Sequence, residues 1–259
     1  MSHPAPAILD RFRLDGRVAI VTGASRGLGA AMAAALAEAG AKVALAATQE
    51  PAATAAHIRA RHGECATFAA DLSDRATPAK LLDAVTERLG PPSILVNNAG
   101  IIRRANVLEH SDEDWDAVME VNLRSVFVLS REFAKRLAAR KAPGRIINIA
   151  SMLSYQGGLR VPGYTAAKSA LAGLTKAMAN ELAPLGINVN AIAPGYMSTD
   201  NTSALRADAA RNKSILERIP ANRWGEPADL QGAVVFLASD ASAYVHGITL
   251  PVDGGWLAR

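Results

Sequence analysis

Three side chains in the middle of the sequence have the types and spacing of a proton-transfer centre. Tyr164 and Lys168 are four residues apart in a stretch with helical periodicity, so their side chains share one helix face. A phenol is a poor base at its unperturbed pKa of about 10, and a nearby ammonium moves that pKa toward the working pH. Ser151 follows the short apolar run Arg145–Ile149 and could hydrogen-bond the same substrate oxygen. These residues predict general acid–base chemistry at an oxygen atom.

Asn122 is a further candidate for the catalytic set. It lies inside a long run with helical periodicity, residues 112–140. An amide side chain in the middle of a helix competes with the backbone for hydrogen bonds, so it seldom lies there without a partner. We therefore expect Asn122 to make a specific polar contact.

A glycine-rich turn, Thr22–Gly29, joins the first apolar run to the first helical run. Gly23 allows a tight turn, Gly27 lets the backbone approach a pyrophosphate, and Gly29 permits close packing of the helix. The N-terminus of that helix supplies free N–H groups and a positive dipole to a phosphate. The spacing is a variant of the dinucleotide-binding fingerprint.

The same turn also matches the G-x-S-x-G pattern of a serine hydrolase, with Ser25 as the nucleophile. A hydrolase elbow needs earlier strands to provide an oxyanion donor, and only one strand precedes this turn. His246 would have to complete the triad and has no evident acid partner. A serine hydrolase is therefore a remote alternative.

The residues after the second predicted strand bear on the choice between NAD and NADP. An acid there would bind the ribose 2′-hydroxyl of NAD, but residues 47–49 are Ala-Thr-Gln. Arg26 in the glycine turn could face a 2′-phosphate, with Ser25 and Thr48 as hydroxyl donors. These residues mildly favour NADP.

Three arginines indicate an anionic substrate. Arg103 and Arg104 follow the fourth predicted strand, and Arg160 precedes Tyr164, so all three can reach the cleft at the strand ends. A planar guanidinium binds a carboxylate through paired hydrogen bonds. Each arginine could equally hold a loop or a subunit contact. Polar groups for recognising substrate hydroxyls are Ser154, Gln156 and Tyr196.

Short apolar runs alternate with longer helical runs along nearly the whole sequence. The predicted strands are Arg17–Thr22, Lys42–Ala47, Ala66–Ala70, Ser93–Asn97, Arg145–Ile149, Asn188–Ile192 and Ile248–Val252. The predicted helices are Leu28–Ala39, Pro51–Arg61, Pro78–Leu89, Asp112–Arg140, Tyr164–Ala183 and Pro227–Ala238. Mostly apolar strands that alternate with helices predict an α/β fold: a Rossmann-type, three-layer, doubly wound parallel sheet of about seven strands.

We expect one catalytic domain over residues 12–259 after a flexible tail over residues 1–11. No linker-like composition divides the chain. The segment 195–226 breaks the alternation of strands and helices and is locally helical at Ser203–Arg218. Insertions of this kind lie over the carboxyl ends of strands, so we expect a cap over the substrate.

Composition excludes several classes of function. The 259 residues carry 28 Lys and Arg against 24 Asp and Glu, without a basic stripe, so we expect no nucleic-acid partner. The single cysteine, Cys65, suits a reducing cytosol, and neither a signal peptide nor a membrane span is evident. No C-x-x-C or H-E-x-x-H pattern suggests a metal. The helices that begin near Asp112 and Tyr164 are apolar around much of their circumference, which favours a symmetric oligomer.

Several motifs in a fixed order resemble the short-chain dehydrogenase/reductase family over Phe12–Arg259. They are Thr22–Gly29, Asp71-Leu72, Asn97–Gly100, Asn122, Ser151, Tyr164-x-x-x-Lys168, Pro194-Gly195 and Val252–Gly255. The resemblance implies an NAD(P)-dependent oxidoreductase acting on CH–OH groups, and a homotetramer. A non-catalytic nucleotide sensor on the same fold is an alternative.

The resemblance also implies roles for individual residues. Tyr164 would be the general acid/base and Ser151 would orient the substrate oxygen. Lys168 would lower the pKa of Tyr164 and hold the nicotinamide ribose, and Asn122 would hold a water in the proton relay. Asp71 would accept from the adenine amino group, and Thr199 would contact the carboxamide. The implied cofactor contacts are Gly23, Ser25, Arg26, Gly27, Leu28, Gly29, Thr48, Asp71, Leu72, Asn98, Ala99, Gly100, Tyr164, Lys168, Pro194, Gly195, Met197 and Thr199.

Four segments are similar to the branch of this family that acts on sugar acids of the gluconate type. They are Ile102–Arg104, Ser151–Pro162, Ala193–Met197 and Asp253–Arg259. This similarity implies interconversion of a secondary alcohol and a ketone on a hexonate. Members of the branch usually use NAD, whereas Ser25, Arg26 and Thr48 resemble the NADP-using members. Another ketoreductase of the family remains the alternative.

Overall fold

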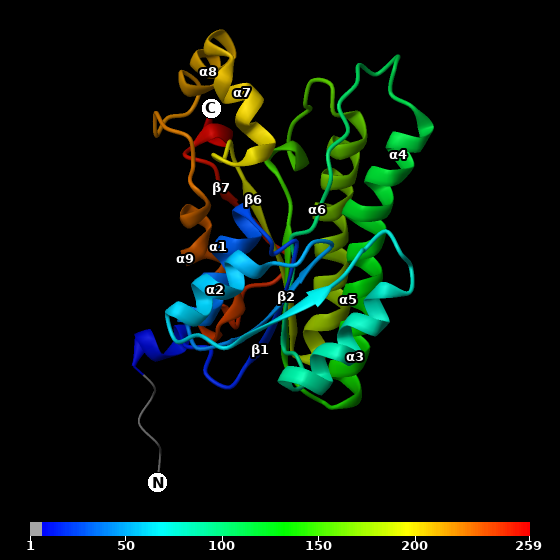
Figure 1. The fold of residues 1–259 in the computed structure, drawn as a ribbon, viewed down its shortest axis with the longest axis vertical. Helices are drawn as coiled ribbons and strands as arrows, with labels where there is room; N and C mark the ends of the chain where they lie inside the picture. The colour runs from blue at the N-terminus through cyan, green and yellow to red at the C-terminus, as the bar shows by residue number, and fades with distance from the viewer. Residues whose placement is uncertain (1–6) are drawn as a thin grey trace.

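Seven parallel strands form one sheet at the centre of the molecule (Figure 1), in a computed structural model that describes residues 7–259. The strands are β1 (Val18–Thr22), β2 (Lys42–Ala47), β3 (Cys65–Ala69), β4 (Ile94–Asn97), β5 (Gly144–Ile149), β6 (Ile187–Pro194) and β7 (Thr249–Val252). Their order across the sheet is β3-β2-β1-β4-β5-β6-β7, and each neighbouring pair is parallel. The predicted doubly wound sheet is confirmed. The order reverses between β1 and β4, which is where such sheets bind ligands.

Helices cover both faces of the sheet, as Figure 1 shows. One layer contains α1 (Gly27–Glu38), α2 (Ala52–Ala60) and α9 (Gln231–Ala238), and the other contains α3 (Thr77–Leu89), α4 (Asp112–Met119), α5 (Ser125–Ala139) and α6 (Pro162–Leu182). Met32 and Leu36 of α1 are fully buried against one face, and Leu129 and Phe133 of α5 are buried against the other. Burying each such side chain contributes roughly 1.5–3 kcal/mol, so two separate cores hold the strand ends in place.

The prediction of one continuous helix over residues 112–140 is wrong in the middle of that range. A π-helical segment, Glu120–Arg124, separates α4 from α5. There the hydroxyl of Ser125 donates to the Val121 carbonyl oxygen at 2.6 Å, and Asn122 is fully buried. Such π-segments occur often at functional sites because they re-aim one turn of a helix. Ser111 caps the start of α4, because its hydroxyl accepts from the N–H of Asp114 at 3.2 Å.

The insertion after β6 rises above the carboxyl ends of the strands (Figure 1). It contains two short helices, α7 (Ser203–Ala207) and α8 (Ala209–Leu216). Its two ends meet, because Met197 and Gly225 form an isolated parallel bridge and the N–H of Ser198 donates to the Gly225 carbonyl at 2.7 Å. The insertion therefore leaves and returns to the sheet at one point.

We expected a flexible tail over residues 1–11, and residues 1–6 of it lie outside the described residues. The next residues form a short 3-10 helix, Ile8–Phe12, where we expected flexible chain. Arg11 Nη2 donates to the carbonyl oxygen of Asp240 at 3.1 Å, which ties this helix to the turn after α9. Among the helices described, none is long and apolar enough to cross a membrane.

Candidate active site

A cleft of about 640 Å³ opens at the carboxyl ends of the strands, next to the reversal of strand order. Every residue predicted to contact the cofactor lines it, and so does Ser151. Residues from eight separate segments therefore come together although they are spread over positions 22–202.

The glycine turn forms a tight backbone cradle at one end of the cleft. Gly23 has φ +66°, and a Cβ there would lie 2.9 Å from Nδ2 of Asn98. A Cβ on Gly29 would overlap the carbonyl oxygen of Gly23. Only glycine fits these two positions, and the cradle leaves backbone exposed to the cleft, which fits a pyrophosphate.

Thr22 and Asn98 join the ends of β1 and β4 beneath this cradle. Thr22 Oγ1 accepts from the N–H groups of Asn98 and Ala99, both at 3.0 Å. Asn98 Nδ2 donates to the carbonyl oxygens of Thr22 and Gly23, at 2.9 and 3.2 Å. Asn98 therefore supports the turn rather than presenting its amide to a ligand.

Tyr164 lies in the first turn of α6 and faces Ser151, which follows β5. Burial raises the pKa of Tyr164 to about 12, while a hydrogen bond from Ser151 and the charge of Arg104 lower it to a smaller extent. Ser151 is itself 9% exposed, and its hydroxyl accepts from the N–H of Leu153 at 3.1 Å. The phenol is thus neutral at neutral pH and is held next to one hydroxyl.

Lys168 is buried one turn below Tyr164. Its Nζ lies 5.6 Å from the centre of the Tyr164 ring and donates to the Ile149 carbonyl oxygen at 2.6 Å. Burial lowers the pKa of Lys168 to about 8. The expected lowering of the pKa of Tyr164 by Lys168 is wrong for this structure. Burial of the phenol outweighs the neighbouring charges, and Lys168 is bonded to β5 instead of the phenol oxygen.

Asn122 is anchored to the loop after β4. Its Oδ1 accepts from the N–H of Ile101 and its Nδ2 donates to the carbonyl oxygen of Ile101, each at 2.8 Å. The specific polar contact that we expected for Asn122 is therefore made with the backbone of Ile101. Val121, not Asn122, lines the cleft.

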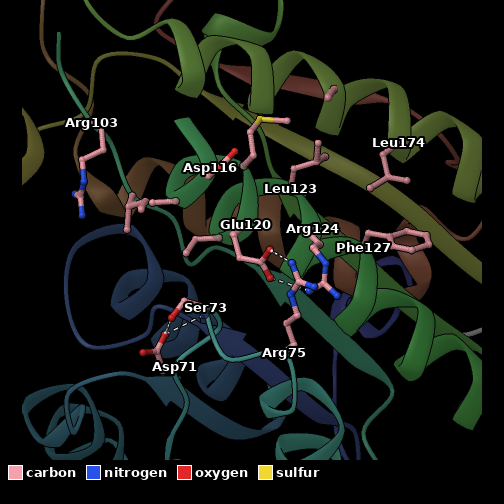
Figure 2. A pocket seen from close by; sticks show the side chains of 15 residues that line it. Asp71, Ser73, Arg75, Arg103, Asp116, Glu120, Leu123, Arg124, Phe127 and Leu174 are labelled. Atoms are coloured by element: carbon pink, nitrogen blue, oxygen red, sulfur yellow. Dashed lines mark hydrogen bonds and ion pairs between the residues drawn. The ribbon is translucent and has the colours of Figure 1, made fainter. Parts of the chain in front are cut away.

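The three arginines predicted to bind substrate occupy different surroundings. Arg103 pairs with Asp114 at 3.1 Å and lines a second hollow of about 1140 Å³ outside α4, α5 and α6. Figure 2 shows Arg103 at the rim of that hollow. Arg104 is the arginine whose charge acts on Tyr164, and its Nη2 donates to the Asn201 carbonyl at 3.3 Å. Arg160 has φ +63°, and its carbonyl accepts from the N–H of Ala105.

The other predicted substrate residues make internal contacts. Ser154 Oγ donates to the carbonyl oxygen of Lys168 at 2.6 Å. Gln156 Oε1 accepts from Arg218 and from Trp256 Nε1, each at 3.2 Å. Tyr196 packs edge-on to Trp224 and Trp256. Within residues 7–259, none of these three and none of the three arginines lines the 640 Å³ cleft.

Asp71 lies at the boundary between the cleft and the outer hollow (Figure 2). Its Oδ1 accepts from the N–H and the hydroxyl of Ser73, at 2.9 and 2.7 Å, and these bonds lower the pKa of Asp71. The carboxylate is exposed and ionised, so it can accept from an amino group. No cluster of three metal-ligating side chains occurs in the described part of the chain.

A sequence model for the family described as Enoyl-(Acyl carrier protein) reductase matches residues 23–257. The chain belongs to the short-chain dehydrogenase/reductase family. It is 53% identical over 252 residues to the 2-dehydro-3-deoxy-D-gluconate 5-dehydrogenase of Dickeya dadantii, covering 97% of this chain and 100% of that one. The Escherichia coli protein of the same name is 54% identical over the same shares of the two chains.

A solved structure is similar over nearly the whole chain. It is a proposed 2-deoxy-D-gluconate 3-dehydrogenase from Agrobacterium tumefaciens with bound NADP, 57% identical, with a TM-score of 0.91 over 96% of this chain and 99% of that one. These findings confirm the prediction of a short-chain dehydrogenase/reductase and of its Rossmann-type fold.

One part of the cleft consists of residues that the sequence motifs of this short-chain dehydrogenase/reductase did not predict. Asp200, Asn201 and Thr202 line it, in a 3-10 turn at the start of the cap. The only sequence signal was the position of the insertion after β6. Among the residues described, no histidine lines the cleft beside Ser25, so the geometry gives the serine hydrolase alternative no support.

Proposed function

We propose that this protein is an NAD(P)-dependent 2-dehydro-3-deoxy-D-gluconate 5-dehydrogenase, also described as 2-deoxy-D-gluconate 3-dehydrogenase. It would interconvert a secondary alcohol and a ketone on a hexonate-type sugar acid. The observation that carries the proposal is the meeting of Ser151, Tyr164 and Lys168 in a cleft that also contains the glycine cradle. The names of the relatives at 53–54% identity support the substrate.

The residues of the cleft fit a nicotinamide dinucleotide. The cradle Gly23–Gly29 would hold the pyrophosphate, Asp71 the adenine amino group, and Lys168 the nicotinamide ribose. Thr199 and Met197, at the start of the cap segment, also line the cleft. When bound, the cofactor would supply the acceptor or donor of hydride.

Tyr164 would exchange a proton with the substrate oxygen. In reduction it donates that proton to the developing alkoxide, and its raised pKa of about 12 keeps it in the protonated state that this step needs. In oxidation the phenolate form of Tyr164 takes the hydroxyl proton and becomes the phenol, and the charge of Arg104 favours that phenolate. Ser151 would hydrogen-bond the same oxygen and orient it. Asn122, through its two bonds to Ile101, would keep the wall of the cleft in place.

Arg104 is the arginine best placed to bind the substrate carboxylate. It follows the cleft-lining residues Ile101 and Ile102, and its charge reaches Tyr164. Arg103 is engaged by Asp114, and Arg160 is exposed on a neighbouring loop. We therefore assign the carboxylate to Arg104. Arg103 and Arg160 would hold loops, and the contacts of Ser154, Gln156 and Tyr196 would shape the wall.

Arg26 supports the use of NADP. It lines the cleft, and residues 47–49 at the end of β2 include no acid, with Thr48 exposed. NADP occupies the similar Agrobacterium structure. We propose that both dinucleotides bind and that NADP is preferred.

The proposal extends to the organisation of the chain. Residues 12–259 would form one catalytic domain with a substrate cap at 195–226. The outer hollow, where Phe127 is 40% exposed, supports a symmetric homotetramer, and the lone Cys65 supports a cytoplasmic location. Light scattering on the purified protein tests the oligomeric state.

One spectrophotometric panel tests the function. Purified protein is supplied with NAD or NADP and with hexonates, ketodeoxy acids and uncharged polyols, and absorbance of the reduced cofactor is followed. We expect turnover with 2-dehydro-3-deoxy-D-gluconate or 2-deoxy-D-gluconate. Turnover of gluconate alone would identify a gluconate 5-dehydrogenase. Binding of NADPH without turnover of any acid would identify a nucleotide sensor.

A further inference from the structure

The turn Asp200–Thr202 lies at the mouth of the cleft and contacts two arginines from different loops. Arg26, in the glycine turn, pairs with Asp200 through Nη1 and Oδ2 at 3.2 Å. Arg104, in the loop after β4, donates from Nη2 to the Asn201 carbonyl at 3.3 Å. Both Arg26 and Asp200 line the cleft. The cation proposed to recognise the cofactor thus already has an anionic partner inside the protein.

We propose that Asp200 is a residue that determines cofactor specificity, because it competes with the 2′-phosphate of NADP for Arg26. This inference rests on the proposed use of NAD(P). NADP must either take Arg26 away from Asp200 or share it with a second anion. NAD has no 2′-phosphate, so the pair does not oppose its binding. Asp200 therefore weakens the preference for NADP that Arg26 provides.

The Asp200 carboxylate is free to act in this way because it plays no part in building its own turn. The turn is closed by Thr202 Oγ1, which donates to the carbonyl of Met197 at 2.6 Å and accepts from the N–H of Thr199 at 3.2 Å. Within residues 7–259, Arg26 is the one charged side chain that pairs with Asp200. Asp200→Asn would leave the turn intact and remove only the charge.

The exposure of the pair sets the size of the effect. Both side chains are 74% exposed, so water and salt screen them. Exposed ion pairs of this kind change an equilibrium constant by about 1.4- to 5-fold. Competition through Asp200 is therefore a modest adjustment of specificity, and we expect it to weaken further in 1 M salt.

Direct binding of NADPH and NADH, followed by the fluorescence of the reduced nicotinamide, tests the inference without turnover. We expect Asp200→Asn to lower the Kd for NADPH by about two- to fivefold and to leave the Kd for NADH unchanged. In an Arg26→Ala background, the same substitution should have no effect on either Kd. Asp83→Asn on α3 is the matched control, because Asp83 is 71% exposed and pairs with Arg136 outside the cleft.

Each alternative outcome is informative. An unchanged ratio of the NADPH and NADH constants in Asp200→Asn overturns the inference and leaves the proposed function standing. If Asp200→Asn lowers the Kd for NADPH equally in the Arg26→Ala background, Asp200 repels the phosphate directly. That outcome also overturns competition for Arg26. Failure of the unmodified protein to bind either dinucleotide overturns the proposed function together with the inference.

Discussion

The cofactor half and the substrate half of the cleft are built by different means. The cofactor half consists of backbone and of short side chains at strand ends, such as the buried Thr22 and the half-buried Asn98, with hydrogen bonds of 2.9–3.2 Å. The proposed substrate half is bordered by long exposed cations on the loop after β4, Arg103 and Arg104, which lie outside the cleft lining and are held by single ion pairs or carbonyl groups.

This difference has a physical consequence for each half. Buried backbone contacts leave no room for an added atom, so the cofactor half tolerates little change. Exposed ion pairs contribute little each and can be exchanged for a ligand at small cost. We therefore expect the cofactor half to fix the chemistry of the family, and the substrate half to set which acid is bound.

The largest effect is expected at Tyr164, where the two halves meet. Tyr164→Phe removes the proton donor and should lower kcat by about a thousandfold. The Kd for NADPH should stay within about twofold, because the ring still fills its place on α6. Steady-state kinetics and fluorescence titration measure the two quantities. Turnover at the normal rate would contradict the assignment of Tyr164.

A substitution in the glycine cradle tests the rigidity of the cofactor half. Gly29→Ala places a Cβ on the carbonyl oxygen of Gly23, so we expect about a hundredfold weaker binding of NADPH. Gly173→Ala on α6 is the control, because a Cβ there meets nothing within 4 Å and alanine favours a helix. Equal binding by both variants would show that the cradle is not tight.

The pH dependence of stability tests whether burial lowers the pKa of Lys168 in the centre of the cleft. Its pKa falls from 10.5 to about 8 on burial, so between these values the unfolded chain binds a proton that the folded chain has lost. The free energy of unfolding should therefore rise with pH, by about 2 kcal/mol from pH 8 to 10. Tyr164, whose pKa is raised, opposes this only above pH 10.

Urea denaturation at pH 8, 9 and 10 measures that rise. Lys168→Met retains the apolar stem and cannot titrate, so its curve should lack the rise. The same slope in both proteins would assign the pH dependence to another group.

The smallest of these effects is expected in the substrate half. Arg104→Ala should raise KM for the sugar acid about tenfold and leave KM for an uncharged polyol unchanged, because only the acid loses a charged partner. Arg160→Ala is the matched control and should change either KM less than twofold. If Arg160→Ala raised KM for the sugar acid more than Arg104→Ala did, the substrate carboxylate would be assigned to Arg160 instead.

The cofactor contacts that the motifs predict all line one cleft, because these residues act through the chain around them. A glycine at positions 23 and 29 is required by a strand–helix turn, and that requirement can be recognised locally. The substrate half gave weaker predictions. Arg103, Arg104 and Arg160 are equivalent as cations in the sequence, and their partners, Asp114, Asn201 and solvent, depend on how distant loops meet.

The sequence by itself determined the strands, most of the helices, the family and the residue types of the proton-transfer centre, because periodicity and glycine spacing are local properties. Only the tertiary structure decided the π-segment at Asn122, the pKa directions of Tyr164 and Lys168, and the pairing of Arg26 with Asp200. Burial and charge pairing depend on segments far apart in the chain, so they exist only once the chain has folded.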